Sequence, residues 1–191
     1  MAYQDMTDSE IMEKIRRFSA EGEESQGAME PYAREIYRRY YQQAYQLSRY
    51  YGLPRHEAED CVQDSFIKLF RIAGNFDSTR EFKPYFFKIV INTVRDCFNE
   101  RKKNRYRDIE QMEDIPEEKD KEIFEKFHIR DQMNGIISRM PENLRSVLVL
   151  RVYGDLDFDS IAGTLGIGVR QLHNRLNRAY EYLRTAVEEE R

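Results

Sequence analysis

The last helical segment of the sequence carries side chains suited to hydrogen bonding with nucleic acid. Residues 157–178 read DFDSIAGTLGIGVRQLHNRLNR. Apolar residues recur there at helical spacing, and most of the positions between them hold arginine, glutamine, asparagine or histidine. These residue types can bond to base edges and phosphates from a DNA groove. The residues predicted on this polar face are Arg170, Gln171, His173, Asn174, Arg175, Asn177 and Arg178.

The residues before this helix predict a helix-turn-helix. Ala162 is small where two helices would cross closely, and Gly166 follows four residues later, where the chain must turn at little steric cost. Asp157 is placed to cap the first of the two helices. An ordinary helical hairpin with a solvated polar face is the alternative. The turn spacing, the apolar residues and the polar composition together favour DNA binding.

No other group of residues has the types and spacing of a catalytic or metal site. The acids of residues 155–159 alternate as at the start of a calcium loop, but the loop's glycine and bidentate glutamate are missing. The acids of residues 57–64 crowd the start of a predicted helix, where acidic side chains favour the helix dipole, so a catalytic carboxylate pair is not expected there. Cys61 and Cys97 are expected in apolar packing. The sequence therefore predicts no catalytic residue, no metal and no cofactor, and so not an enzyme.

The distribution of charge matters more than its total. The net charge of −4 argues against a nucleic-acid binder when it is taken alone. However, residues 108–131 hold 10 acidic and 4 basic residues, while residues 88–107 hold seven basic and two acidic ones. We interpret the acidic run as a solvated linker. Basic residues before it and on the last helix can then grip a polyanion at two places.

Helical periodicity dominates the rest of the chain, which predicts an all-α fold of two small helical modules. Expected helices run to about residue 18, from 32 to 51, from 56 to 72, from 83 or 84 past 98, from 141 to 153, from 157 to 165 and from 169 onward. The predicted organisation is an N-terminal extension with a short helix (1–29), a first module (30–107), the acidic linker (108–131) and a second module (132–191).

Three blocks of sequence together resemble a known family. They are residues 58–70 (AEDCVQDSFIKLF), residues 82–103 (FKPYFFKIVINTVRDCFNERKK) and residues 140–184. In order and spacing they are similar to the bacterial RNA polymerase sigma factors, specifically the small extracytoplasmic-function (ECF) group, which keeps only conserved regions 2 and 4. The resemblance covers roughly residues 30–103 and 135–186, which is most of the chain.

The resemblance implies roles for both modules. Asp60, Gln63 and Asp64 match the region 2 helix that docks on the clamp coiled coil of core polymerase. Residues 74–81 and the following helix match the element that reads the −10 promoter sequence and captures a flipped base of the non-template strand. The helix-turn-helix matches region 4, which binds the −35 element. The residues implied in −10 DNA contact are Asn75, Phe76, Asp77, Tyr85, Lys88, Asn92, Arg95, Arg101, Lys102 and Lys103.

The partners implied are core RNA polymerase, through its clamp coiled coil and flap, and promoter DNA in double- and single-stranded form. An anti-sigma factor is a further expected partner. The N-terminus lacks a signal sequence and no stretch reaches the roughly 18 apolar residues of a membrane span, so a cytoplasmic protein without membrane insertion is expected. The alternative is a stand-alone helix-turn-helix regulator whose first half only dimerises. Such a regulator would not need the region 2 block.

Overall fold

The computed structural model describes residues 3–21, 26–107, 133 and 135–189, and within these ranges the chain is helical without a β-strand. The elements in chain order are η1 (Tyr3–Asp5), α1 (Asp8–Glu21), α2 (Gln26–Tyr51), α3 (Arg55–Arg71), η3 (Ala73–Asn75), α4 (Phe82–Arg107), α6 (Glu142–Tyr153), α7 (Phe158–Leu165) and α8 (Val169–Glu189). The all-α prediction is confirmed. The predicted acidic linker, 108–131, lies outside the described residues.

Helices α1 to α4 form the first bundle around an apolar and aromatic core. The helical spacing of apolar residues places one face of each helix inward. The ring of Tyr40 on α2 lies edge-on to the rings of Phe82 and Phe86 on α4, with centroids 5.1 and 5.4 Å apart. Phe86 and Phe87 are fully buried. These rings therefore hold the bundle together and leave only their polar and charged neighbours for a partner.

Helix α2 begins at Gln26, although the sequence predicts a start after Pro31. Proline has no amide hydrogen, so inside a helix it removes the hydrogen bond to the carbonyl four residues earlier. That carbonyl belongs to Gly27, at the exposed beginning of the helix, where water can replace the lost bond. The helix therefore extends through the proline at low cost.

Helices α6, α7 and α8 form the second bundle, with α6 at its centre. Helix α6 contacts both α8 and α2, and residues 144–150 are all buried. The Asp157 carboxylate accepts a hydrogen bond of 2.7 Å from the Ser160 amide and caps α7. Gly166 ends α7 in the left-handed region with φ of 66°, which favours glycine. The predicted helix-turn-helix is present as α7, the Gly166 turn and α8.

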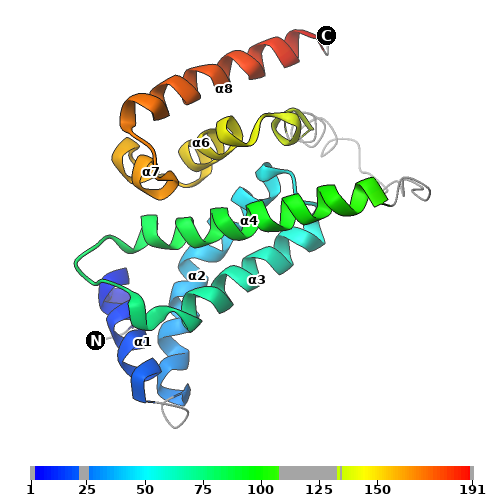
Figure 1. The fold of residues 1–191 in the computed structure, drawn as a ribbon. Coiled ribbons are helices and arrows are strands. Elements are labelled where there is room, and N and C mark those ends of the chain that lie inside the picture. Colours follow the sequence, from blue (N-terminus) through cyan, green and yellow to red (C-terminus); the bar gives the residue numbers. More distant parts are fainter. Residues whose placement is uncertain (1–2, 22–25, 108–132, 134, 190–191) are drawn as a thin grey trace, which may run out of the picture.

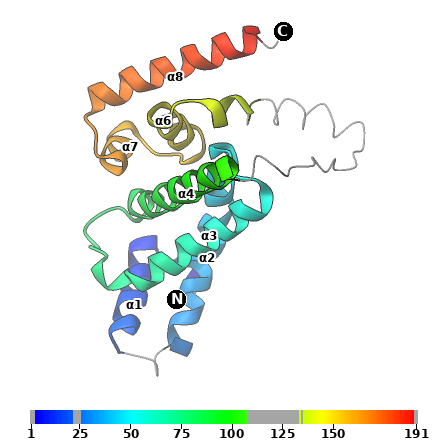
Figure 2. The same ribbon diagram turned by 45° about the vertical axis from the view of Figure 1, so that its right-hand side comes forward.

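The two bundles pack directly against each other through α2, α4, α6 and α7. In Figures 1 and 2, α6 and α7 lie between α4 and α8, so α8 forms a face remote from α1. The rings of Tyr50 and Tyr153 stack across this contact with centroids 3.8 Å apart. The ammonium of Lys83 pairs with the Asp155 carboxylate at 2.8 Å. The buried apolar residues of the two bundles consequently form one continuous core.

Candidate nucleic-acid and polymerase interfaces

The polar residues predicted for DNA contact lie on the outer face of α8. The apolar side chains Leu172, Leu176 and Ala179 are buried, and Arg175 is half-buried. The exposed members of the predicted set are Arg170, Gln171, His173, Asn174, Asn177 and Arg178. Because these six exposed side chains share one face of α8, that face is available to a groove of duplex DNA.

An aromatic contact orients His173 on this face. Its ring stacks on Phe158 of α7, with centroids 4.5 Å apart and an interplanar angle of 27°. The Arg151 guanidinium also lies over the Phe158 ring, 4.8 Å from its centroid, and donates a 3.1 Å hydrogen bond to the Leu156 carbonyl. A side chain held in this way reaches a base edge with less loss of rotamer entropy. Helical spacing within the last helix does not indicate this contact, because Phe158 is fifteen residues away.

A second exposed surface lies on α3, one helix of the first bundle. Asp60, Gln63 and Asp64 are all exposed, as their predicted role requires. Ile67 lies one turn beyond and is 53% exposed, so an apolar side chain adjoins the acidic ones. We call these four residues the α3 face. Its acidic and apolar groups suit a protein partner better than nucleic acid, whose phosphates the two carboxylates would repel.

The loop between η3 and α4 is organised by its own hydrogen bonds. Asp77 Oδ1 accepts bonds of 3.0 Å from the Thr79 amide and 2.7 Å from the Thr79 hydroxyl. The guanidinium of Arg80 pairs with the same carboxylate at 3.3 Å. The Thr79 bonds, with Arg80, lower the pKa of Asp77 from its usual value. Asn75 and Asp77 are exposed, so this loop offers fixed polar groups to a partner.

Phe76 differs from its predicted role as a DNA contact. It is 2% exposed, and its ring lies 5.9 Å from that of Phe82 and 5.2 Å from that of Tyr85. Burying a phenylalanine ring contributes roughly 1.5–3 kcal/mol, so Phe76 anchors the loop to the core. Tyr85 is half-buried, and burial raises the pKa of its hydroxyl. It is Tyr85 that keeps an accessible ring beside the loop.

Two of the polar residues predicted for −10 contact face solvent on α4. Lys88 and Asn92 are both exposed and lie about one helical turn apart. With the loop and Tyr85 they form a continuous polar surface at the beginning of α4. The side chains of Lys102 and Lys103, also predicted to contact phosphates, lie outside the described residues.

Two other predicted phosphate contacts have partners within the chain. Arg95 lies against the second bundle, with Nε 2.9 Å from Glu142 Oε1 and Nη2 donating to the Ser146 hydroxyl at 3.2 Å. Arg101 pairs with Glu57 at 3.5 Å. In this arrangement each guanidinium group forms an ion pair with a glutamate of the same chain. Contact of Arg95 with DNA therefore requires its pairing with the second bundle to open.

Helix α1 supports the loop, a role that the sequence did not indicate. Ile11, Met12 and Ile15 are fully buried, and α1 packs against both α2 and η3. The Asp8 carboxylate at its start accepts hydrogen bonds from the Arg39 guanidinium, at 2.7 Å, and from the hydroxyl of Tyr40. Because η3 leads into the loop, α1 forms part of the structure that positions it.

A buried carboxylate extends this charged network on α2. Glu35 is 7% exposed and accepts hydrogen bonds of 2.8 and 2.7 Å from Arg38 and Arg39. Its two arginine partners, Arg38 first, outweigh desolvation and hold the pKa of Glu35 at about 2. A carboxylate whose pKa is lower in the folded than in the unfolded chain stabilises the fold at pH values above its unfolded pKa, which is 4.5 for glutamate. The contribution is complete at neutral pH and is lost as the pH falls toward 2.

Two further kinds of site are not found in the part of the chain that the structure describes. No group of three or more His, Cys, Asp and Glu side chains there is arranged to hold a metal ion. None of the described helices has both the length and the apolar character needed to cross a membrane.

The sequence matches two family descriptions in the order that the two bundles follow. Residues 36–105 match Sigma-70 region 2, and residues 130–183 match Sigma-70, region 4. The first match contains the α3 face, the loop and most of α4. The second contains α6, α7 and α8 as far as Leu183.

Individual proteins that are similar to this chain are also sigma factors. The RNA polymerase sigma-H factor of Pseudomonas aeruginosa is 30% identical over 142 residues, covering 69% of this chain and 74% of its own. The ECF RNA polymerase sigma factor SigE of Mycolicibacterium smegmatis is 27% identical over 176 residues, covering 87% of this chain and 65% of its own. The sigma factor RpoE of Bartonella quintana, solved with the anti-sigma factor NepR, has a similar fold with a TM-score of 0.63 at 16% identity, over 82% of this chain and 99% of that one.

Proposed function

The chain belongs to the ECF group of RNA polymerase sigma factors, and from this premise we propose how its surfaces divide the work of promoter-specific initiation. The α3 face docks on core polymerase at the clamp coiled coil. The loop of residues 74–81 and the beginning of α4 read the −10 element and help to melt it, and α8 reads the −35 element. The chain has no catalytic activity of its own and acts in the cytoplasm through the polymerase.

One observation carries this proposal: two separate exposed polar surfaces stand on two bundles that match sigma regions 2 and 4 in order. The exposed face of α8 suits the major groove of a duplex. The loop and Tyr85 suit an unpaired strand, since an accessible ring can stack on a base. A stand-alone helix-turn-helix regulator is not favoured, because residues 36–105 match sigma region 2.

Run-off transcription with purified core polymerase tests the proposal. We expect the full chain to direct transcripts from a pool of templates with randomised upstream sequence, and the selected templates to share two short motifs. Asp64→Lys is the matched variant, because it reverses one charge of the exposed α3 face. It is expected to lose polymerase binding while keeping duplex binding through α8. A chain that neither binds core polymerase nor directs initiation would remove the proposed function.

Arg175→Ala is expected to weaken binding of the −35 duplex across sequences and to reduce the salt slope by about 1, the effect of losing one phosphate contact. Arg175 is half-buried on α8, so its guanidinium has a restricted orientation. Fluorescence anisotropy over a salt series measures both quantities. Arg184→Ala, an exposed position further along the same helix, is the control for loss of charge alone. Equal affinities for wild type and Arg175→Ala would show that Arg175 does not contact a phosphate.

An anti-sigma factor is the remaining proposed partner. The related RpoE of Bartonella quintana was solved as a complex with the anti-sigma factor NepR. An inhibitor of this chain needs to hold the two bundles in a form that polymerase cannot use. The paired state of Arg95 and Glu142 is the arrangement that such a partner would preserve.

A further inference from the structure

The two cysteines of the chain lie against each other on facing helices. Cys61 is on α3 and Cys97 on α4, and these two helices pack together along the first bundle. The two thiols interact with each other across this pair of helices. The sequence contains no other cysteine. Two thiols in contact across a helix pair make a site whose chemistry neither residue has alone.

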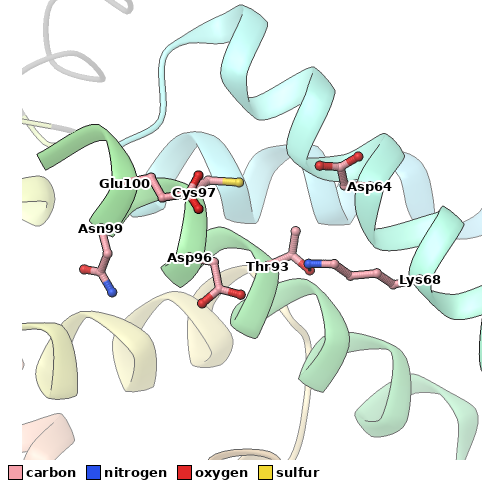
Figure 3. A pocket seen from close by; sticks show the side chains of 7 residues that line it. All are labelled: Asp64, Lys68, Thr93, Asp96, Cys97, Asn99 and Glu100. Carbon is pink, nitrogen blue, oxygen red and sulfur yellow. The ribbon is translucent and has the colours of Figure 1, made fainter. Parts of the chain in front are cut away.

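The two thiols differ in their access to solvent. Cys61 is 1% exposed, whereas Cys97 is half-buried and lines a cavity of about 400 Å³ between α3 and α4. Figure 3 shows the polar side chains that line this cavity, including Asp64 and Lys68 of α3. The Lys68 ammonium reaches across to donate a 3.1 Å hydrogen bond to the Thr93 hydroxyl of α4. A small water-soluble reagent can therefore reach Cys97 before it reaches Cys61.

The surroundings also shift the pKa values of the two thiols in opposite directions. The interaction with the Cys61 thiol lowers the pKa of the Cys97 thiol, and the Lys68 charge adds to this effect. Desolvation and the carboxylates of Asp64 and Glu100 act in the opposite direction. The interaction with Cys97 and burial raise the pKa of Cys61. An accessible thiol with a lowered pKa beside a buried one is the arrangement of an attacking and a resolving cysteine.

We propose that Cys97 and Cys61 form an oxidation site, at which hydrogen peroxide converts the two thiols into a disulfide between α3 and α4. The Cys97 thiolate attacks one peroxide oxygen, the O–O bond breaks, and Cys97 sulfenic acid forms with release of hydroxide. Cys61 sulfur then attacks the sulfenic sulfur, so that an S–S bond forms and the S–O bond breaks. The oxygen leaves as water with the proton of the Cys61 thiol.

The position of the site links it to the proposed docking surface. Asp64 belongs both to the α3 face and to the wall of the cavity that exposes Cys97. Core polymerase bound to the α3 face would cover the opening of this cavity, a consequence that rests on the proposed function. The oxidation chemistry itself depends only on the two cysteines and their access.

Mass spectrometry of the folded, reduced full chain tests the site. After brief exposure to hydrogen peroxide, the wild type is expected to lose the mass of two hydrogens, and non-reducing peptide mapping to show Cys61 joined to Cys97. Cys61→Ser is expected to stop at a sulfenic acid on Cys97 that dimedone traps, while Cys97→Ser does neither. Cys61→Ala is tested with dimedone in the same way as Cys61→Ser, in case serine disturbs the core. Circular dichroism confirms that each variant is folded. An unchanged wild-type mass, or dimers joined through Cys97, would overturn the proposal.

Alkylation by iodoacetamide with and without core polymerase separates the site from the docking assignment. Protection of Cys97 by polymerase, together with the intramolecular disulfide in the free chain, supports both. An intramolecular disulfide in the free chain together with unprotected Cys97 in the complex keeps the oxidation site and contradicts docking at the α3 face. Protection without any disulfide under peroxide keeps the docking face and overturns the oxidation site.

Discussion

Arg145→Ala is expected to lower the free energy of unfolding by about 3–5 kcal/mol and to separate the second bundle from the first. Arg145 is 2% exposed. Its Nη2 donates hydrogen bonds of 2.7 Å to the Ser138 and Met140 carbonyls, and Nη1 donates one of 3.4 Å to the Tyr51 carbonyl. The guanidinium carbon lies 4.1 Å from the centroid of the Phe98 ring and 4.9 Å from that of Tyr51.

This cation is balanced by helix ends rather than by a carboxylate in contact. Tyr51 ends α2, and Ser138 lies in the short helical stretch before α6, so their carbonyls belong to the negative ends of two helices. Alanine would leave three buried or half-buried carbonyls without this donor and open a cavity at the junction of both bundles. Burial lowers the pKa of Arg145, consistent with a charge held away from water.

Chemical denaturation and small-angle X-ray scattering measure the two expected effects. Arg145→Lys keeps the charge but cannot reach three carbonyls with a planar fork, so an intermediate loss of stability is expected. Arg184→Ala removes an exposed arginine of the second bundle and is the matched control. The radius of gyration of Arg145→Ala should increase while that of the control should not. Equal denaturation midpoints for these two variants would show that Arg145 does not hold the bundles together.

The elements themselves were largely predictable from local sequence. Apolar spacing gave the helices, and Asp157 and Gly166 marked the ends of α7, because caps and turns depend on residues a few positions apart. The exposed set on α8 followed from the same periodicity. The start of α2 differed from the predicted one because Pro31 lies close enough to an exposed helix end to be tolerated.

The contacts between distant segments were not predictable in this way. Arg145 lies within a strongly apolar helix, and the sequence alone does not tell an inward arginine from a solvent-exposed one. Its partner on α2, Tyr51, is more than ninety residues away. Arg95 has the composition of a phosphate contact, yet in this arrangement its nearest anion is Glu142 of the other bundle. Periodicity identifies which face of a helix is buried, but it does not identify the surface that covers it.

The −10 surface, formed by the loop of residues 74–81 and the beginning of α4, shows the same difference between local and distant contacts at the level of single residues. Resemblance placed Asn75, Phe76 and Asp77 together at the site, because the three are adjacent in sequence. The structure exposes the two polar residues and buries the ring between them. The support from α1 was also missed, since the resemblance begins only at about residue 30 and leaves the N-terminal extension without a role. A residue can therefore serve such a site by fixing its backbone without touching the ligand.

Ile11→Ala combined with Ile15→Ala is the second large expected effect, a loss of roughly 4–10 kcal/mol in the stability of the first bundle. Both side chains are fully buried against α2 and η3. Each isoleucine-to-alanine change in a core costs roughly 2–5 kcal/mol, and typical domains have only about 5–15 kcal/mol in total. The double variant is therefore expected to lose the folded first bundle, while Ile11→Ala alone stays folded but less stable.

The single variant tests whether α1 acts on the −10 surface through the loop. Under conditions where Ile11→Ala is folded, its affinity for a single-stranded −10 oligonucleotide is expected to fall, because η3 and the loop lose a packing surface. Its affinity for the −35 duplex, which α8 binds, is expected to stay at the wild-type value. Arg16→Ala, which changes only an exposed residue of α1, should alter neither affinity. If Ile11→Ala is less stable but binds the −10 strand like the wild type, α1 contributes to folding alone and the loop is positioned without it.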